Sequence, residues 1–153
     1  MKLLTVLLAT TLIAPAATEA QDIAGKWTAA YPRGIRNING VEEAEMGTAI
    51  VTLEVKGDSV FGSWYPQNTP RPAQPRALKG TFTNGKLTLV AEATEATIRR
   101  GGAMSGGETI KLVGYFEAEF KDGVLEGTMR SESADGTVRN GPHKWSARRE
   151  AAK

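Results

Sequence analysis

The chain has 153 residues, with 19 Lys and Arg against 17 Asp and Glu, a formal net charge of +2. This length accommodates one domain, and so small a charge gives no indication of nucleic-acid binding. The absence of Cys excludes disulfides, thiolate nucleophiles and Cys-ligated metals, and the single His excludes a multi-histidine metal site. With 41% hydrophobic residues and 17 Gly, the composition is typical of a folded, turn-rich domain.

The first twenty residues are typical of a secretory signal peptide. Lys2 gives a positive start, residues 3–15 are apolar apart from three Thr, and small residues lead to Ala20. The apolar run is shorter than the roughly 20 residues of a membrane span. An uncleaved anchor or a buried N-terminal helix is the alternative. We expect residues 1–20 to be a signal peptide, residues 21–153 to be the mature domain, and the protein to be secreted or periplasmic.

After residue 20, apolar and polar residues alternate with the period of a β-strand. The first strand is expected from Ile23 to Tyr31, and seven further alternating runs follow. Sequences that favour turns separate several of these runs, at residues 56–58, 84–85, 121–123 and 134–136. Because short turns join neighbouring strands, the pattern predicts an all-β fold, an eight-stranded antiparallel up-and-down meander.

Four of the expected strands carry a glycine in phase with their apolar face: Gly62, Gly80, Gly114 and Gly127. A glycine inside a strand marks a bend or a close backbone approach. Closing a small barrel requires strongly coiled strands, whereas a flat sandwich has less need of one glycine per strand. Closure also removes the sheet edges that invite aggregation. The glycines therefore favour a barrel over a sandwich.

The two ends of the domain carry motifs that resemble those of lipocalins and their calycin relatives. Gly25 and Trp27 form a Gly-x-Trp motif in the first strand, and Arg148 and Arg149 close the last one. The resemblance implies that Trp27 lies across the closed end of the barrel under an Arg. Alternation from Trp145 makes Arg149 the inward candidate and Arg148 the second. An indole can fill a barrel end while a guanidinium stacks on it. The second lipocalin motif, Thr-Asp-Tyr, and the family's disulfide are absent.

Five inward-facing residues are candidates for contacts with a ligand in the barrel. An eight-stranded barrel is just wide enough to be filled by side chains or to hold one small ligand. The in-phase glycines would leave space, and aromatic side chains would line it. The alternative is that these residues pack only against one another. They are Trp64, Phe82, Phe116, Met129 and Trp145.

A second candidate site is a basic rim around one end of the barrel. In a meander, the connections after the first, third and fifth strands lie at the same end. We expect these connections at residues 31–36, 65–76 and 99–107, and a basic mouth there would attract anions. The alternative is that long loops simply collect soluble residues. The arginines are Arg33, Arg36, Arg71, Arg76, Arg99 and Arg100.

The sequence carries no recognisable catalytic motif. His143 follows Gly-Pro in an expected exposed turn, without a Gly-x-Ser-x-Gly nucleophile motif. The acidic residues at 42–45 lack the alternating pattern of a calcium loop and are expected in a solvated loop. The glycine-rich residues 99–107 lack the Gly-Lys-Ser/Thr of a phosphate loop. We therefore expect a protein that is not an enzyme and holds neither a metal nor a cofactor.

Two functions remain open. The first is a monomeric binding protein for a small apolar or amphipathic ligand, including an anionic one. The second is an envelope interaction protein, such as a protease inhibitor, that acts through its rim loops or through residues 21–24. Neither function involves nucleic acid, and no transmembrane segment is expected after removal of the signal peptide.

Overall fold

The computed structural model describes residues 22–69, 72–98 and 107–150, without the side chains of residues 35–37 and 98. The expected signal peptide lies outside the described residues. Within them, no helix is long and apolar enough to cross a membrane. The described chain forms eight strands: β1 (Gly25–Ile38), β2 (Val41–Lys56), β3 (Ser59–Gln67), β4 (Arg76–Thr83), β5 (Lys86–Ile98), β6 (Glu108–Lys121), β7 (Val124–Ser133) and β8 (Arg139–Arg149).

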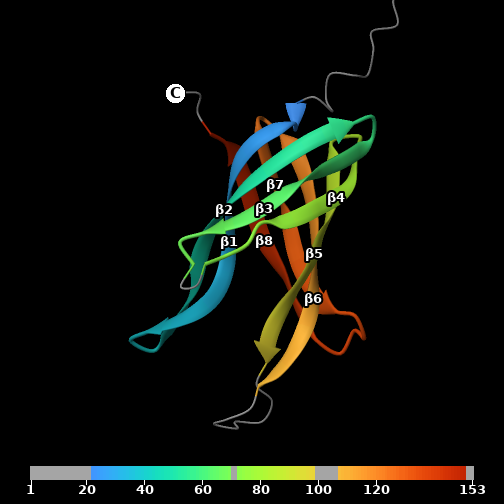
Figure 1. The fold of residues 1–153 in the computed structure, drawn as a ribbon. Helices are drawn as coiled ribbons and strands as arrows, with labels where there is room; N and C mark the ends of the chain where they lie inside the picture. The colour runs from blue at the N-terminus through green and yellow to red at the C-terminus, as the bar shows by residue number, and fades with distance from the viewer. Residues whose placement is uncertain (1–21, 70–71, 99–106, 151–153) are drawn as a thin grey trace, which may run out of the picture.

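The strands form a closed antiparallel barrel in sequence order (Figure 1). Each strand pairs with the next, and β8 pairs back with β1 from Trp27↔Arg149 to Ala30↔Ser146. The predicted eight-stranded meander barrel is confirmed, and a two-sheet sandwich is excluded. The turns that begin at residues 57, 84 and 122 lie at the same end as the start of β1 and the end of β8. We call this end the closed end and the opposite one the open end.

The predicted turns are confirmed, and their residues have the backbone angles that tight hairpins require. Asn84 and Gly85 have φ of 52° and 74°, and Asp122 and Gly123 have φ of 52° and 77°. Two successive residues with positive φ are typical of the two-residue turn whose twist matches that of the flanking strands. These turns keep β4–β5 and β6–β7 in register at the closed end.

Three of the in-phase glycines lie where a strand bends against its neighbour. A Cβ added to Gly62, Gly80 or Gly127 would lie only 1.9, 1.7 or 1.8 Å from a backbone carbonyl oxygen of the adjacent strand. No side chain fits at such a distance, so the backbone there requires glycine. The close approaches occur on β3, β4 and β7 and allow the strong coiling that closes the barrel.

Strands β1 and β2 are longer than the sequence predicted. β1 runs to Ile38 instead of Tyr31, and β2 begins at Val41, so residues expected in a loop are paired in register. Pro32 and Gly34 indicated a loop, but a register shift between them lets the strand continue. The expected acidic loop at residues 42–45 is likewise part of β2.

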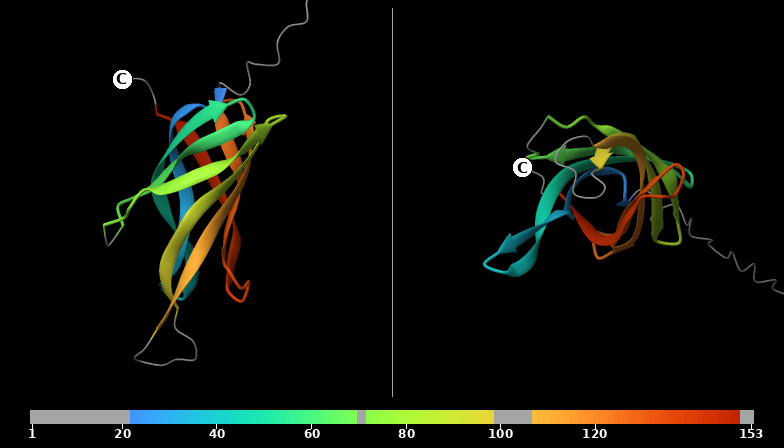
Figure 2. Two further views of the ribbon diagram at one scale, coloured as in Figure 1. Left: turned by 45° about the vertical axis from the view of Figure 1, so that its right-hand side comes forward. Right: turned by 90° about the horizontal axis from the view of Figure 1, so that it is seen from below.

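At the open end the strands separate into two-stranded ribbons. β1 pairs with β8 only as far as Ala30, and β2 pairs with β3 only from Thr48, so residues 31–47 form a ribbon of β1 and β2 alone. Residues 94–98 of β5, beyond a bulge, likewise pair only with β6. Figure 1 and the right view of Figure 2 show the β1–β2 ribbon leaving the barrel wall, and the left view of Figure 2 shows β5 and β6 reaching far beyond the closed body.

Candidate functional site at the open end of the barrel

The closed end is sealed by Trp27, which is fully buried. Its Nε1 donates to the carbonyl oxygen of Ile23 at 2.9 Å, and the guanidinium carbon of Arg149 lies 4.8 Å from its ring centroid. Arg149 also donates to the carbonyl oxygen of Asp22. A Cβ on Gly25 would lie 3.2 Å from the Arg149 guanidinium, so the glycine leaves room for this stacking. The predicted plug of Trp27 and Arg149 is confirmed.

Arg148, the second candidate for the plug, is exposed and pairs in register with Thr28 and Val124. It belongs to the outward-facing set of β8 and does not cover the indole. The indole and the guanidinium block the closed end, so a ligand that enters along the barrel axis comes from the opposite end.

The middle of the barrel is filled by aromatic side chains. Trp64, Phe116 and Trp145 form a cluster with centroid separations of 4.9, 5.5 and 6.1 Å. Trp145 also donates from Nε1 to the carbonyl oxygen of Thr128 at 3.1 Å. All three rings are buried, as is Phe82, and Met129 packs against the cluster while partly exposed. The predicted inward positions are confirmed. The rings of Trp64, Phe116 and Trp145 form a floor beneath the open end, whereas Phe82 pairs with Leu87 next to the turn at the closed end. Contact of the predicted residues with a ligand stays a prediction.

Arg76 enters the barrel directly above this floor. It is the first residue of β4, in phase with the buried Leu78 and Phe82, and it pairs in register with Trp64. A Cβ added to Gly114 would lie 3.4 Å from Nη2 of Arg76 and 3.4 Å from the ring of Phe116. The missing side chain at Gly114 therefore leaves the space that the guanidinium occupies beside the aromatic cluster. The sequence analysis placed Arg76 in a rim loop, whereas it is an inward-facing strand residue.

The electrostatic environment of Arg76 is unusual for a guanidinium. Its Nε and Nη2 donate to the backbone carbonyl oxygen of Glu92 at 2.9 and 2.6 Å. Among the described residues, no carboxylate oxygen lies within ion-pair distance of it. Burial lowers the pKa of Arg76, while the negative charge of Glu92 opposes this shift. The carbonyl accepts hydrogen bonds from the guanidinium but does not neutralise its positive charge. This partly desolvated cation can therefore attract an anion.

The β5–β6 ribbon adds a partly apolar wall on the same side of the open end. Register pairs on its inner face continue the alternation of the buried Ala91 and of Gly114 past a bulge in β5. Each of these residues is only partly buried, so apolar surface is left in contact with solvent. The wall consists of Thr94, Ala96, Ile110 and Leu112.

Of the other rim arginines, only Arg33 has its side chain within the described residues, so the basic collar stays a prediction. Arg33 is an exposed β1 residue whose guanidinium pairs with Glu45 and donates to the carbonyl oxygen of Asn68 at 2.9 Å. The chain order does place the connections after β1, β3 and β5 at one end, as predicted. Outside the described part lie the side chain of Arg36 and the whole of Arg71, Arg99 and Arg100.

A small pocket of about 220 Å³ lies between β1, β7 and β8 at the open end. In it, Nε2 of His143 lies 2.9 Å from Oδ1 of Asn140. His143 belongs to strand β8 and is partly buried, so the prediction of an exposed turn residue was wrong. The Gly-Pro pair before it indicated a turn. A strand edge without a hydrogen-bonded neighbour tolerates a proline, however, because the missing N–H is not needed for pairing. The pocket is lined by Tyr31, Pro32, Arg33, Met129, Arg130, Ser131, Asn140 and His143.

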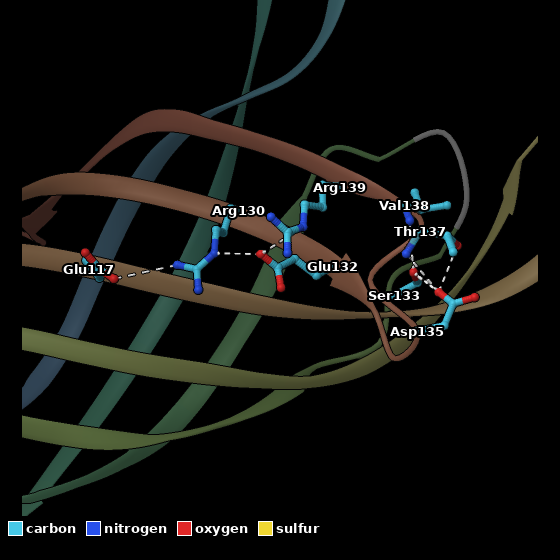
Figure 3. Close-up of polar contacts among 8 residues, drawn as sticks. All are labelled: Glu117, Arg130, Glu132, Ser133, Asp135, Thr137, Val138 and Arg139. Atoms are coloured by element: carbon cyan, nitrogen blue, oxygen red, sulfur yellow. Dashed lines mark hydrogen bonds and ion pairs between the residues drawn. The ribbon is translucent and has the colours of Figure 1, made fainter.

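An ion-pair network on the outer surface fixes Arg130 beside this pocket (Figure 3). The guanidinium stacks 4.6 Å from the ring centroid of Tyr115. Its nitrogens lie 3.0 Å from the carboxylate of Glu132 and 3.6 Å from that of Glu117, and Arg139 also reaches Glu132 at 3.9 Å. The network ties β6, β7 and β8 together on the outside of the barrel.

A larger hollow, of about 1030 Å³, lies on the outside of the barrel over β5–β8. Outward-facing residues of both charges line it, including Lys86, Lys144, Glu117 and Glu126. It lies where β7 bends at Gly127. Its lining also includes the buried Leu87, Ala118 and Trp145, and its charged residues carry both signs, so no isolated charge marks it as a site for an ion.

The described residues contain no group of three His, Asp or Glu side chains that could hold a metal ion. Comparisons with protein-family models, with curated proteins and with solved structures find no match. The resemblance to lipocalins that the end motifs suggest therefore stays a prediction.

Proposed function

We propose that this protein binds a small amphipathic ligand with an anionic head group at the open end of its barrel. The observation that carries the proposal is the position of Arg76, an inward-facing cation beside an aromatic floor, without a carboxylate at ion-pair distance among the described residues. In this arrangement the head group contacts Arg76, and the apolar part lies along the wall of Ile110 and Leu112.

The energetics support an anionic head group. Removing a cation from water costs free energy, and one carbonyl acceptor compensates only part of it. A bound carboxylate would restore the lost electrostatic stabilisation, because hydrogen bonds between ionised partners are about twice as strong as neutral ones. The partly exposed apolar wall gives a second gain, since covering it removes apolar surface from water.

The resemblance of the first twenty residues to a signal peptide supports a secreted or periplasmic location for this activity. Mass analysis of the N-terminus after expression with export tests this part of the proposal. A mature chain that begins near Gln21 supports it, and an intact chain retained in the cytoplasm contradicts it.

Titration with decanoate and decanol, followed by Trp fluorescence, tests the binding proposal. Two of the three indoles, Trp64 and Trp145, belong to the floor, so a ligand above them should change the emission. We expect saturable binding of decanoate. Replacing Arg76 with Met should weaken it about 10- to 100-fold, since a hydrogen bond to a charged group contributes about 1.5–3 kcal/mol. Decanol binding should change little.

Arg139→Met is the matched control, because Arg139 is an exposed arginine at the same end of the barrel. It should leave the affinity for decanoate unchanged. Arg76→Lys provides a second variant. It keeps the positive charge but loses the planar guanidinium that can donate two hydrogen bonds to a carboxylate, and it should bind decanoate with intermediate affinity. An absence of saturable binding for carboxylates of six to sixteen carbons would contradict the proposal.

The second candidate function, binding of a protein partner, is favoured by the shape of the β1–β2 ribbon. Its tip exposes Ile38 and Val41 by 42% and 59%, at the end of a two-stranded extension of the barrel. Ile38→Ser with Val41→Ser should abolish co-purification of an envelope protein while leaving decanoate binding intact. If this double variant lost decanoate binding but still co-purified with the envelope protein, the result would argue against this candidate.

A further inference from the structure

The barrel wall is incomplete between β1 and β8 at the open end. The register between these strands ends at Ala30↔Ser146. Beyond it, residues 31–38 of β1 pair only with β2, and residues 139–145 of β8 pair only with β7. Two strand edges therefore face a common gap, which we call the β1–β8 seam. An unpaired edge presents backbone N–H and C=O groups that can pair with another strand.

The seam has selective features as well as free edges. Pro32 on β1 and Pro142 on β8 each lack a backbone N–H that could donate to an added strand. A proline on a strand edge therefore reduces non-specific pairing with the strands of other proteins. The 220 Å³ pocket opens between the same two strands and supplies a receptor for a side chain. Backbone edges together with a side-chain pocket are the two components of recognition by strand addition.

The chemistry of the pocket indicates which side chain fits. Tyr31, Pro32 and Met129 provide apolar surface, while Arg33, Arg130 and His143 bring basic groups, and its lining contains no carboxylate. The two guanidiniums pair with glutamates that lie outside the lining. A side chain with an apolar stem and an acidic end matches both parts of this lining.

From the geometry we infer that the β1–β8 seam binds an extended peptide segment of a partner protein as an added strand, with an acidic side chain of that segment in the pocket. This interaction differs from the proposed ligand site at β4–β6, although the two adjoin where Tyr31 of the pocket contacts Trp64 of the floor, with ring centroids 5.1 Å apart. Either one can fail without the other, because Arg76 does not line the pocket and Arg33 does not lie on the aromatic floor.

The test uses the whole ¹⁵N-labelled protein and the acetylated, amidated peptide Thr-Val-Thr-Glu-Thr-Val-Thr. Two companion peptides carry Lys in place of Glu, or N-methyl groups on alternate backbone amides. We expect the Glu peptide to shift the amide resonances of the non-proline residues within 31–38 and 139–145, and to slow their hydrogen exchange. The Lys and N-methylated peptides should bind at least about tenfold more weakly, equivalent to about 1.4 kcal/mol.

Two protein variants separate the pocket from the general charge of this end. Arg33→Gln removes a guanidinium from the lining and should weaken the Glu peptide several-fold. Lys111→Gln, on the exposed outer face of β6 at the same end of the barrel, should not change its affinity. Both replaced side chains are solvent-accessible, so both variants should fold.

Three outcomes would overturn the inference. The first is the absence of shifts at the seam with about 1 mM Glu peptide, a concentration that reveals even weak association. The second is equal binding of all three peptides. The third is protection of the same edges by raising the protein concentration alone, since a second copy of the chain would then occupy the seam.

Discussion

The guanidinium of Arg149, at the end of the last strand, stacks on the indole of Trp27 near the start of the first, 4.8 Å from the ring centroid. The two residues are also register partners across the strand pair that closes the barrel. One contact thus seals the closed end and joins the two termini of the sheet. Along the barrel axis, the aromatic floor is then open to the end that carries Arg76.

Removal of the stacked cation should destabilise the barrel. Arg149→Met keeps an apolar stem but loses the charge and the hydrogen bond to Asp22, and should reduce the free energy of unfolding by about 0.5–2 kcal/mol. Chemical denaturation measures the effect. Arg148→Met, one residue earlier and outward-facing, is the control and should change stability little. Equal losses in both variants would show that the stacking contributes nothing specific.

Replacing a glycine at a close backbone approach should be costly. In Gly80→Ala, the new methyl would lie 1.7 Å from the carbonyl oxygen of Thr88, so β4 and β5 would have to separate. Overpacking of this kind costs about 1–3 kcal/mol or more. In Gly34→Ala the nearest atom, on Glu45, is 3.9 Å away, and we expect little change. Thermal unfolding of the two variants compares them, and similar melting temperatures would contradict the coiling argument.

The aromatic floor should contribute strongly to stability. Phe116 is 2% exposed and lies in the cluster with Trp64 and Trp145, so Phe116→Ala should cost about 3–5 kcal/mol and weaken the near-ultraviolet circular dichroism of the indoles. Phe61 on the outer surface of β3 is 42% exposed, and Phe61→Ala is the control. A small, equal effect of both substitutions would mean that the ring cluster is loosely packed.

The β7–β8 turn should contribute an acid-sensitive part of the stability. Hydrogen bonds from Ser133 and from the backbone and side chain of Thr137 lower the pKa of Asp135 from 3.8 to about 2. A depressed carboxyl pKa stabilises the folded state above the unfolded value, and this contribution is lost as the pH falls from about 4 through about 2.

Urea unfolding at a series of pH values measures that contribution. Asp135→Asn should reduce the pH dependence below pH 4, and the double variant Ser133→Ala with Thr137→Val should raise the carboxyl pKa toward its ordinary value. If the amide resonance of Thr137 titrated near pH 4 in the wild-type protein, the hydrogen-bonded turn would not exist in solution.

The sequence predicted the barrel because each of its signals is local. Alternation marks the strands, Asn84-Gly85 marks a hairpin, and Gly62, Gly80 and Gly127 mark bends that the structure places against neighbouring carbonyls. The plug of Trp27 and Arg149 was also predictable, because the family resemblance connects the two ends of the domain.

The open end was harder to predict, because its features depend on contacts between distant strands. Pro32 and Gly34 favoured a loop, and only the pairing with β2 keeps those residues extended. The inward direction of Arg76 had a signal in the sequence, its alternation with Leu78, Gly80 and Phe82. The neighbouring prolines masked this signal by placing Arg76 in a loop. The ion pair of Arg33 with Glu45 depends on strand register, which composition does not reveal.

The most direct test of the central claim is to locate the ligand by NMR, from the side-chain ¹⁵N–H resonances of Arg76 and Trp64 during a titration with decanoate. The account predicts that both resonances shift and saturate together, that those of Arg139 and Trp27 stay unchanged, and that decanol shifts Trp64 but not Arg76. Saturable decanoate binding that leaves Arg76 and Trp64 unchanged would place the ligand elsewhere and contradict the proposed site.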